Sequence, residues 1–170
     1  MLDLWKYLGE GRPMDVRIRP MSTPQDADAF RALNEQWISE HFTLEAEDRR
    51  QLDDPVAAIV DPGGQVLVAE SEGRVVGCVA LRPAGDGVYE LSKMAVAREF
   101  RGRGLGRRVL SAAVTRAASL GASSLFLGSS TRLPDAVHLY ETLGFVHVAP
   151  EDLGLPYARA DVFMRLQLPA

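Results

Sequence analysis

Glycines and arginines alternate between Arg101 and Arg108, directly before an amphipathic stretch that predicts a helix from about Leu105 to Ser119. The first amide groups of a helix have no hydrogen-bond partner inside it, and together with the helix dipole they attract anions. Glycines let an anion approach the backbone, and neighbouring arginines add charged donors. The run therefore predicts a site for a phosphate-like anion at a helix N-terminus.

The glycine spacing separates this site from two other phosphate-binding turns. No Lys-Ser or Lys-Thr pair follows Gly106, so the run is not a P-loop. Gly102, Gly104 and Gly106 also lack the Gly-x-x-Gly interval of a dinucleotide-binding turn. The pattern that fits is Arg-x-x-Gly-x-Gly, starting at Arg101.

Alternating apolar residues, capping signals and turn residues predict the elements that position this site. Thr23, Pro24 and Asp26 have the types and spacing of a helix N-terminus. In chain order we expect a strand at 16–19, helices from 24 and over 44–52, strands at 66–70, 74–81 and 88–96, a helix at 105–119, a strand at 124–127, a helix at 134–143, and strands at 145–148 and 162–168. The three strands before the glycine run are expected to form an antiparallel meander.

Two segments resemble the GNAT N-acetyltransferase superfamily. Residues 89–96, followed by 101–106, look like the fourth strand and acetyl-CoA loop of that family. Residues 136–145 resemble its C-terminal helix, which ends in Leu-Tyr-x-x-x-Gly-Phe. The resemblance runs from about residue 16 onward. It implies an α+β, three-layer fold: a mixed, mainly antiparallel sheet of six or seven strands, flanked by about four helices, with the fourth and fifth strands splayed apart.

The resemblance implies acetyl-CoA as cosubstrate. The main chain of Met94, Ala95 and Val96 would bind the pantetheine arm, and the amides of the glycine run would bind the pyrophosphate. That run consists of Arg101, Gly102, Arg103, Gly104, Leu105, Gly106 and Arg107. The side chains of Arg101 and Arg103 could assist there or reach the adenosine phosphate.

One position departs from the family pattern. Many members have an asparagine where this chain has Leu133, followed by Pro134. A side-chain contact to the CoA arm is therefore expected to be missing, or to come from nearby hydroxyl groups. The candidates for that contact are Ser129, Ser130 and Thr131.

Two residues are the predicted catalytic groups. Tyr140 matches the family tyrosine often assigned as the general acid for the departing thiolate, although its ring could instead only pack between helix and strand. Glu90 is the first candidate for a base, because it lies on the strand that would carry the pantetheine contacts. It could alternatively bind the substrate ammonium group or be an edge charge. Water chains could also replace a dedicated base.

The acceptor side is expected near the first helices and the last loop. Trp37, His41 and Phe42 could line an acceptor pocket, and Glu70 is a weaker candidate there because it lies beside a turn. Acidic residues between 34 and 52 and between 149 and 161 would suit a cationic amine, unless they form only a solvated helix face. A small amine or an amino acid is the first expectation, followed by protein amines. A different acyl-CoA, or a nonenzymatic acyl-CoA-binding module, stays open.

The bulk composition sets the remaining expectations. The 170 residues suit one domain over 15–170 behind an N-terminal arm at 1–14. A net charge of −4 argues against nucleic-acid binding, and no apolar run reaches the ~20 residues of a membrane span. The N-terminus does not resemble a secretory signal, which predicts a cytoplasmic protein. No metal-ligand spacing is present, so no metal is expected, and a homodimer is left open.

Overall fold

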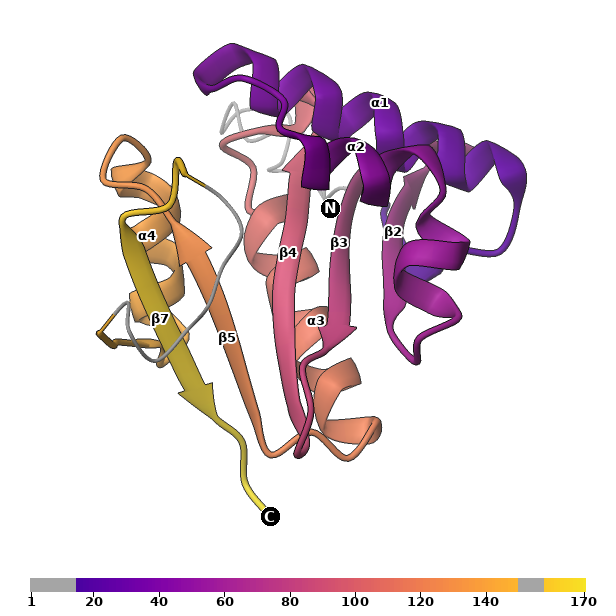
Figure 1. The fold of residues 1–170 in the computed structure, drawn as a ribbon. Helices are drawn as coiled ribbons and strands as arrows, with labels where there is room; N and C mark the ends of the chain where they lie inside the picture. The colour runs from indigo at the N-terminus through magenta and orange to yellow at the C-terminus, as the bar shows by residue number, and fades with distance from the viewer. Residues whose placement is uncertain (1–14, 150–157) are drawn as a thin grey trace, which may run out of the picture.

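The structure is a computed structural model that describes residues 15–149 and 158–170 (Figure 1). Its elements are β1 (Arg17–Pro20), α1 (Pro24–His41), α2 (Ala46–Asp53), the π-helical turn η2 (Val56–Val60), β2 (Gln65–Ser71), β3 (Arg74–Pro83), β4 (Val88–Val96), the 3-10 turn η3 (Arg98–Phe100), α3 (Leu105–Ser119), β5 (Ser124–Ser129), α4 (Pro134–Thr142), β6 (Val146–His147) and β7 (Val162–Gln167). The predicted arm at 1–14 and most of the predicted loop at 149–160 lie outside the described residues.

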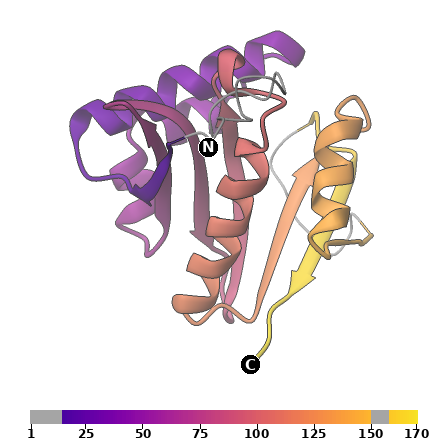
Figure 2. The ribbon, with the colours of Figure 1, turned by 180° about the vertical axis from the view of Figure 1, so that it is seen from behind.

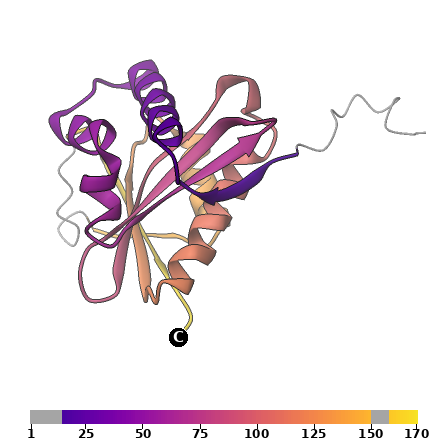
Figure 3. The same ribbon diagram turned by 90° about the vertical axis from the view of Figure 1, so that its right-hand side faces the viewer.

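Seven strands form one sheet in the order β1-β2-β3-β4-β5-β7-β6. Every neighbouring pair is antiparallel except β4 and β5, which run parallel. Helices α1 and α2 cover one face, and α3 and α4 cover the other (Figures 1 and 2). The side view in Figure 3 shows α1 and α3 on opposite sides of the sheet. The predicted three-layer, mainly antiparallel fold and its meander are confirmed.

Strands β4 and β5 stay together along only part of their length. Their pairing runs from Val88 opposite Ser124 to Glu90 opposite Phe126. Beyond Glu90, β4 continues to Val96 on β3, while β5 continues to Ser129 on β7. The two strands diverge visibly in both face-on views (Figures 1 and 2). The splay predicted for the fourth and fifth strands is confirmed.

The start of α1 forms as its sequence predicts. Thr23 Oγ1 accepts a hydrogen bond from the Asp26 amide at 3.1 Å, and the Asp26 carboxylate accepts one from the Thr23 amide at 3.3 Å. This capping box satisfies amide groups that the helix itself leaves unpaired. The same carboxylate binds the Arg19 guanidinium with two bonds of 2.7 and 3.0 Å. The N-terminal end of helix α1 is thereby fixed to β1.

The core lies on both faces of β3, whose residues from Val76 to Leu81 are buried. Helix α3 packs on one face through Leu105, Val109 and Leu110, together with two buried alanines. The bounds of β4 and α3 coincide with the predicted 88–96 and 105–119. Strand β6 has only two residues, and neither η2 nor η3 was predicted from the sequence.

Two further properties concern the described residues alone. None of their helices is long and apolar enough to cross a membrane. Between residues 15 and 149 and from 158 onward, no group of three or more His, Cys, Asp or Glu side chains is placed to hold a metal ion.

Candidate active site

A cavity of about 300 Å³ lies where β4 and β5 separate. Its wall is built by the end of α1, by β4, by the end of β5 with the turn that follows, by α4, and by residues 159–160. The lining residues are Asn34, Trp37, Ile38, Phe42, Glu90, Leu91, Ser92, Lys93, Met94, Ala95, Val96, Arg101, Gly128, Ser129, Ser130, Leu133, Asp135, Ala136, Leu139, Tyr140, Arg159 and Ala160. Both predicted catalytic residues and all three predicted pantetheine-binding residues therefore line the same cavity.

The N-terminus of α3 is an open backbone surface. Gly104 is its N-cap with φ +83°, and no side chain caps the helix. Gly102 has φ +71°, and a Cβ added at Gly102 or Gly104 would meet no heavy atom within 4 Å. Positive φ is readily adopted only by glycine. The amides that follow Gly104 are thus accessible to an anion, which fits the phosphates of a CoA-like ligand.

The arginine side chains around this surface already have protein partners. Arg101 Nε donates to the Val96 carbonyl at 2.9 Å, and its Nη1 donates to Glu40 at 2.8 Å. The Arg103 guanidinium lies 5.2 Å from the centre of the Phe100 ring. Arg101 Nη2 is one of several buried side-chain atoms in the described residues that have no hydrogen-bond partner. The backbone of the glycine run is therefore more available to a phosphate than the Arg101 side chain, and one β4 carbonyl is already occupied.

Tyr140 lies on α4 with its side chain buried in the cavity wall. Its ring packs against Phe145 at a centroid distance of 5.8 Å. Burial raises the pKa of the Tyr140 hydroxyl to about 12. The phenol is consequently protonated at neutral pH, which suits a proton donor. The packing role and the acid role proposed from the sequence are compatible in this geometry.

Glu90 lies on β4 and is 7% exposed. Arg82, its direct neighbour across the β3–β4 ladder, donates a hydrogen bond to the carboxylate at 3.2 Å. Burial raises the pKa of the Glu90 carboxyl, while the charges of Arg82 and Lys93 partly oppose that effect. A carboxyl group with a raised pKa accepts a proton more readily than an exposed glutamate does.

Lys93 is a cavity residue that the sequence reasoning missed. It has φ +53°, and the β3–β4 register shifts opposite it, between Cys78 and Ala80. Its ammonium group lies 2.9 Å from the Asp48 carboxylate, and burial lowers the pKa of Lys93. The available signal was a lysine directly before the apolar residues Met94, Ala95 and Val96 of a predicted strand, because a lysine is seldom buried unless paired.

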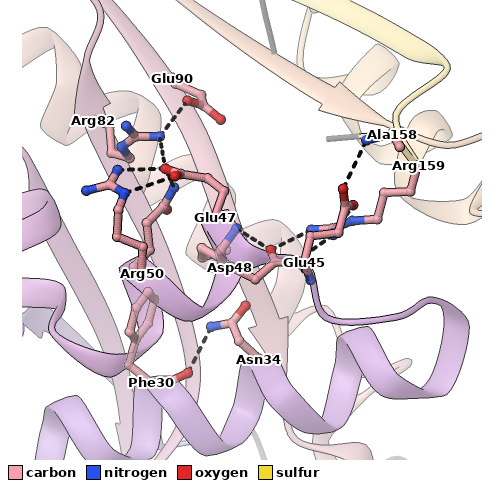
Figure 4. A network of polar contacts seen from close by, with 12 residues as sticks. Phe30, Asn34, Glu45, Glu47, Asp48, Arg50, Arg82, Glu90, Ala158 and Arg159 are labelled. Carbon is pink, nitrogen blue, oxygen red and sulfur yellow. Dashed lines mark hydrogen bonds and ion pairs between the residues drawn. The ribbon is translucent and has the colours of Figure 1, made fainter. Parts of the chain in front are cut away.

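Of the acids expected to form an open rim, Glu47 and Asp48 are instead paired with cations (Figure 4), and Glu151 and Asp152 lie outside the described residues. Asp48 binds Lys93 and Arg159. Glu47 accepts hydrogen bonds from Arg50 at 2.9 and 2.6 Å and lies 3.8 Å from Arg82. These carboxylates therefore contribute little free negative charge to the cavity mouth.

The predicted acceptor-binding residues divide into two groups. Trp37 and Phe42 line the cavity. His41 does not line it; its ring packs beside them, with centroid distances of 5.3 and 6.3 Å. Glu70 lies in β2, pairs with Arg19 at 2.9 Å and is also not a lining residue. The structure thus does not bring Glu70 to the site.

Among the residues considered around Leu133, some line the cavity and one does not. Leu133, Ser129 and Ser130 line the cavity, as the missing family asparagine suggested. Thr131 is engaged elsewhere, since its hydroxyl donates to Asp161 at 2.8 Å. Of the three hydroxyl-bearing candidates that replace the family asparagine, Ser129 and Ser130 are therefore the two that line the cavity.

A sequence model of the acetyltransferase (GNAT) family matches residues 27–145. The chain belongs to this family. Among its GNAT relatives is an N-acetyltransferase of Schizosaccharomyces pombe, 33% identical over 144 residues that cover 82% of this chain and 88% of the relative. The N-acetylaspartate synthetase of Xenopus tropicalis is 44% identical over 92 residues, which cover 51% of this chain but only 32% of that protein.

Solved GNAT structures agree with the fold. An acetyltransferase from Staphylococcus aureus superposes with a TM-score of 0.82 at 17% identity, covering 91% of this chain and 99% of its own. The acetyltransferase yncA of Salmonella typhimurium, solved with its cofactor acetyl-CoA, has a TM-score of 0.70 at 27% identity and covers 91% and 94%. As a GNAT protein, this chain is an acetyltransferase.

Proposed function

We propose that the protein transfers the acetyl group of acetyl-CoA to a primary amine of a small molecule or amino acid, by direct attack in a ternary complex. The observation that carries the proposal is the gap between β4 and β5, which leads to the uncapped, glycine-lined start of α3. A long ligand with an apolar arm and a charged diphosphate fits such a path. Acetyl-CoA, bound by the Salmonella relative, has this form.

In this proposal, β4 holds the pantetheine arm and α3 holds the pyrophosphate. Met94 and Ala95 lie on the strand edge that β5 has left, and both line the cavity. The amides after Gly104 receive the phosphates, while Gly102 leaves the approach open. When bound, acetyl-CoA supplies an acetyl group activated as a thioester.

Side chains of the protein then carry out the proton transfers. The Glu90 carboxylate accepts a proton from the acceptor ammonium group, directly or through water, which leaves a nucleophilic amine. As the new nitrogen–carbon bond forms and the carbon–sulfur bond breaks, the Tyr140 hydroxyl gives its proton to the sulfur. The nitrogen then loses its second proton, which returns to the Tyr140 oxygen directly or through water, while the first proton leaves Glu90 to solvent. Trp37 and Phe42 flank the acceptor. The net result is one amide and one free thiol.

The preference for a small acceptor is supported by the names of relatives. Sequence relatives include an N-acetylaspartate synthetase and a mycothiol acetyltransferase. A structural relative from Brucella melitensis is a ribosomal-protein-alanine N-acetyltransferase, which makes protein amines the second candidate. We place the protein in the cytoplasm as one domain over 15–170, and a homodimer stays a prediction.

A panel of amines tests the proposal. Each amine is incubated with acetyl-CoA, propionyl-CoA or succinyl-CoA, released thiol is measured, and the product is identified by mass spectrometry. We expect at least one amine to release thiol from acetyl-CoA and to gain an acetyl group. Binding of acetyl-CoA without any product would favour a nonenzymatic module, and absence of a thermal shift with acetyl-CoA would refute the donor assignment.

A further inference from the structure

Asp48 is a fully buried acid that joins three separate parts of the chain (Figure 4). On its own helix α2, it accepts a hydrogen bond from the Glu45 amide at 2.9 Å. From β4, Lys93 Nζ lies 2.9 Å from Oδ1. From the segment before β7, Arg159 donates two hydrogen bonds of 2.7 Å, one to each oxygen. We call Asp48, Lys93 and Arg159 the Asp48 clamp.

The clamp residue on β4 lies at the point where that strand departs from regular pairing. The positive φ of Lys93 is a conformation that side chains rarely adopt without support from their surroundings. Support comes from both ends of the residue: Nζ pairs with Asp48, and the carbonyl accepts a hydrogen bond from Cys78 Sγ at 3.5 Å. The bulge directly precedes Met94 and Ala95, so it sets the direction of the strand edge assigned to the pantetheine arm.

Arg159, the clamp residue that lies before β7, belongs to the part of the cavity wall that is proposed to face the acceptor. We call this part the acceptor wall. Arg159 and Ala160 line the cavity. Arg159 also binds Glu45 at 2.9 Å, and the Ala158 amide donates to the same carboxylate at 3.2 Å. Its guanidinium lies 5.9 Å from the centre of the Phe42 ring, which is also in the wall. The position of this wall therefore depends on Glu45, the N-cap of α2, and on Asp48 in the first turn of that helix.

The carboxyl group of the clamp is held as an anion. Burial alone would raise the pKa of Asp48, but the hydrogen bonds from Arg159 and the charge of Lys93 lower that pKa to about 2. A buried carboxylate with two cationic partners is costly to disrupt, because removing one member leaves the others without compensation. Asp48 is thus charged and fully buried, and it has no part in the proposed proton transfers. Its contacts hold two cavity walls.

We propose that Asp48 is a positioning residue, which fixes the β4 bulge and the acceptor wall relative to one another through Lys93 and Arg159. The inference rests on the proposed acyl transfer. Asp48 touches neither substrate, so its loss should act on the geometry of transfer and on acceptor affinity. One carboxylate holds both partners. The fold-decrease in kcat/KM for a variant changed at both Asp48 and Arg159 should therefore be smaller than the product of the two single fold-decreases.

Asp48→Asn tests the clamp, because it keeps the shape of the side chain and an oxygen for the Glu45 amide but removes the charge. The matched control is Asp53→Asn, the same change on the same helix at an exposed side chain. We expect kcat/KM for the acceptor to fall at least tenfold in Asp48→Asn and to stay within about twofold in Asp53→Asn. An equal kcat/KM in the two variants would overturn the proposal.

A double-variant cycle separates positioning from general loss of stability. Arg159→Gln should lower kcat/KM for the acceptor, and the Asp48→Asn, Arg159→Gln protein should be no worse than Asp48→Asn alone. Arg159→Lys keeps an ion pair and should recover part of the activity lost in Arg159→Gln. Losses that multiply, or a lysine variant no better than the glutamine variant, would refute the clamp. If Asp48→Asn does not fold, the Lys–Gln comparison at Arg159 decides.

Amide hydrogen exchange gives a readout that does not depend on turnover. Relative to Asp53→Asn, Asp48→Asn should exchange faster at residues 93–96 and 158–160 together, with unchanged exchange in α3. Unchanged exchange in both segments would contradict the proposal. An inactive wild-type protein would refute the proposed function, whereas an active wild type with an equally active Asp48→Asn variant would refute only the clamp.

Discussion

Burial raises the pKa of both Glu90 and Tyr140, and this change suits the two residues to complementary roles in proton transfer. It raises the pKa of the Glu90 carboxyl and raises the pKa of the Tyr140 hydroxyl to about 12. The glutamate becomes a better proton acceptor, and the tyrosine keeps the proton that it donates in the proposed mechanism. The two residues come from β4 and α4, on either side of the gap. Two variants test these assignments.

Tyr140→Phe removes the proposed acid and keeps the ring that packs on Phe145. We expect kcat to fall about a hundredfold, the usual scale for one general acid, with little change in acetyl-CoA affinity or melting temperature. Steady-state kinetics and thermal unfolding measure these quantities. Tyr89→Phe is the control, since Tyr89 is a part-buried β4 tyrosine that does not line the cavity. Equal kcat in both variants would remove Tyr140 from the mechanism.

Glu90→Gln tests the proposed base through the pH profile. A base works only when deprotonated, so activity should rise with pH through the Glu90 pKa. Because burial raises that pKa, the rise should lie above the usual range of a glutamate. We expect Glu90→Gln to lose this limb in a profile of kcat/KM, and the exposed Glu141→Gln to keep it. An unchanged acidic limb in Glu90→Gln would favour proton loss through water.

At the scale of elements, the local signals were sufficient wherever a turn or a cap decides the structure. Thr23, Pro24 and Asp26 predicted the start of α1, and the capping box forms. The start of α3 at Leu105 follows from the glycines before it. The bulge at Lys93 could not be predicted, because it depends on pairing with β3 and on Asp48, which is distant in the sequence. The η2 turn has no comparable local signal.

The Asp26 contacts give a prediction about the joint between β1 and α1. The hydrogen bonds from Arg19, stronger than the opposing effect of burial, lower the Asp26 pKa to about 2. The folded state therefore binds fewer protons than the unfolded chain between about pH 2 and pH 4, so this contribution is present above pH 4 and is lost as pH falls. We expect Asp26→Asn to lower the free energy of unfolding by about 2 kcal/mol at pH 7 and by less at pH 3.

Urea unfolding at the two pH values measures this difference. Asp28→Asn is the matched control, because Asp28 is exposed on the same helix. A loss from Asp26→Asn that is as large at pH 3 as at pH 7 would show that the contribution does not come from the charged form.

At the scale of the whole molecule, the active site is a consequence of one parallel pair in an antiparallel sheet. Strand β5 pairs with β4 only as far as Phe126 and then follows β7, which opens the gap. The family resemblance predicted this opening, and Met94, Ala95 and Val96, which it assigned to the pantetheine arm, line the cavity. Glu70 and His41 were chosen by position in the chain and do not line the cavity, whereas Lys93 and Arg159, which were not chosen, line it and are held by long-range ion pairs.

The central claim is that the open start of α3 binds acetyl-CoA for transfer to an amine. Gly104→Ala tests it against Gly121→Ala, because both glycines have φ near +80° with open space around a Cβ, at opposite ends of the same helix. The decisive measurement is amine-dependent CoA release, with the N-acetylated product quantified alongside. We predict one CoA per acetylated amine in the wild type and in Gly121→Ala, and an acetyl-CoA KM at least tenfold higher in Gly104→Ala. CoA release that does not depend on amine, or an equal acetyl-CoA KM in the two variants, would contradict the account.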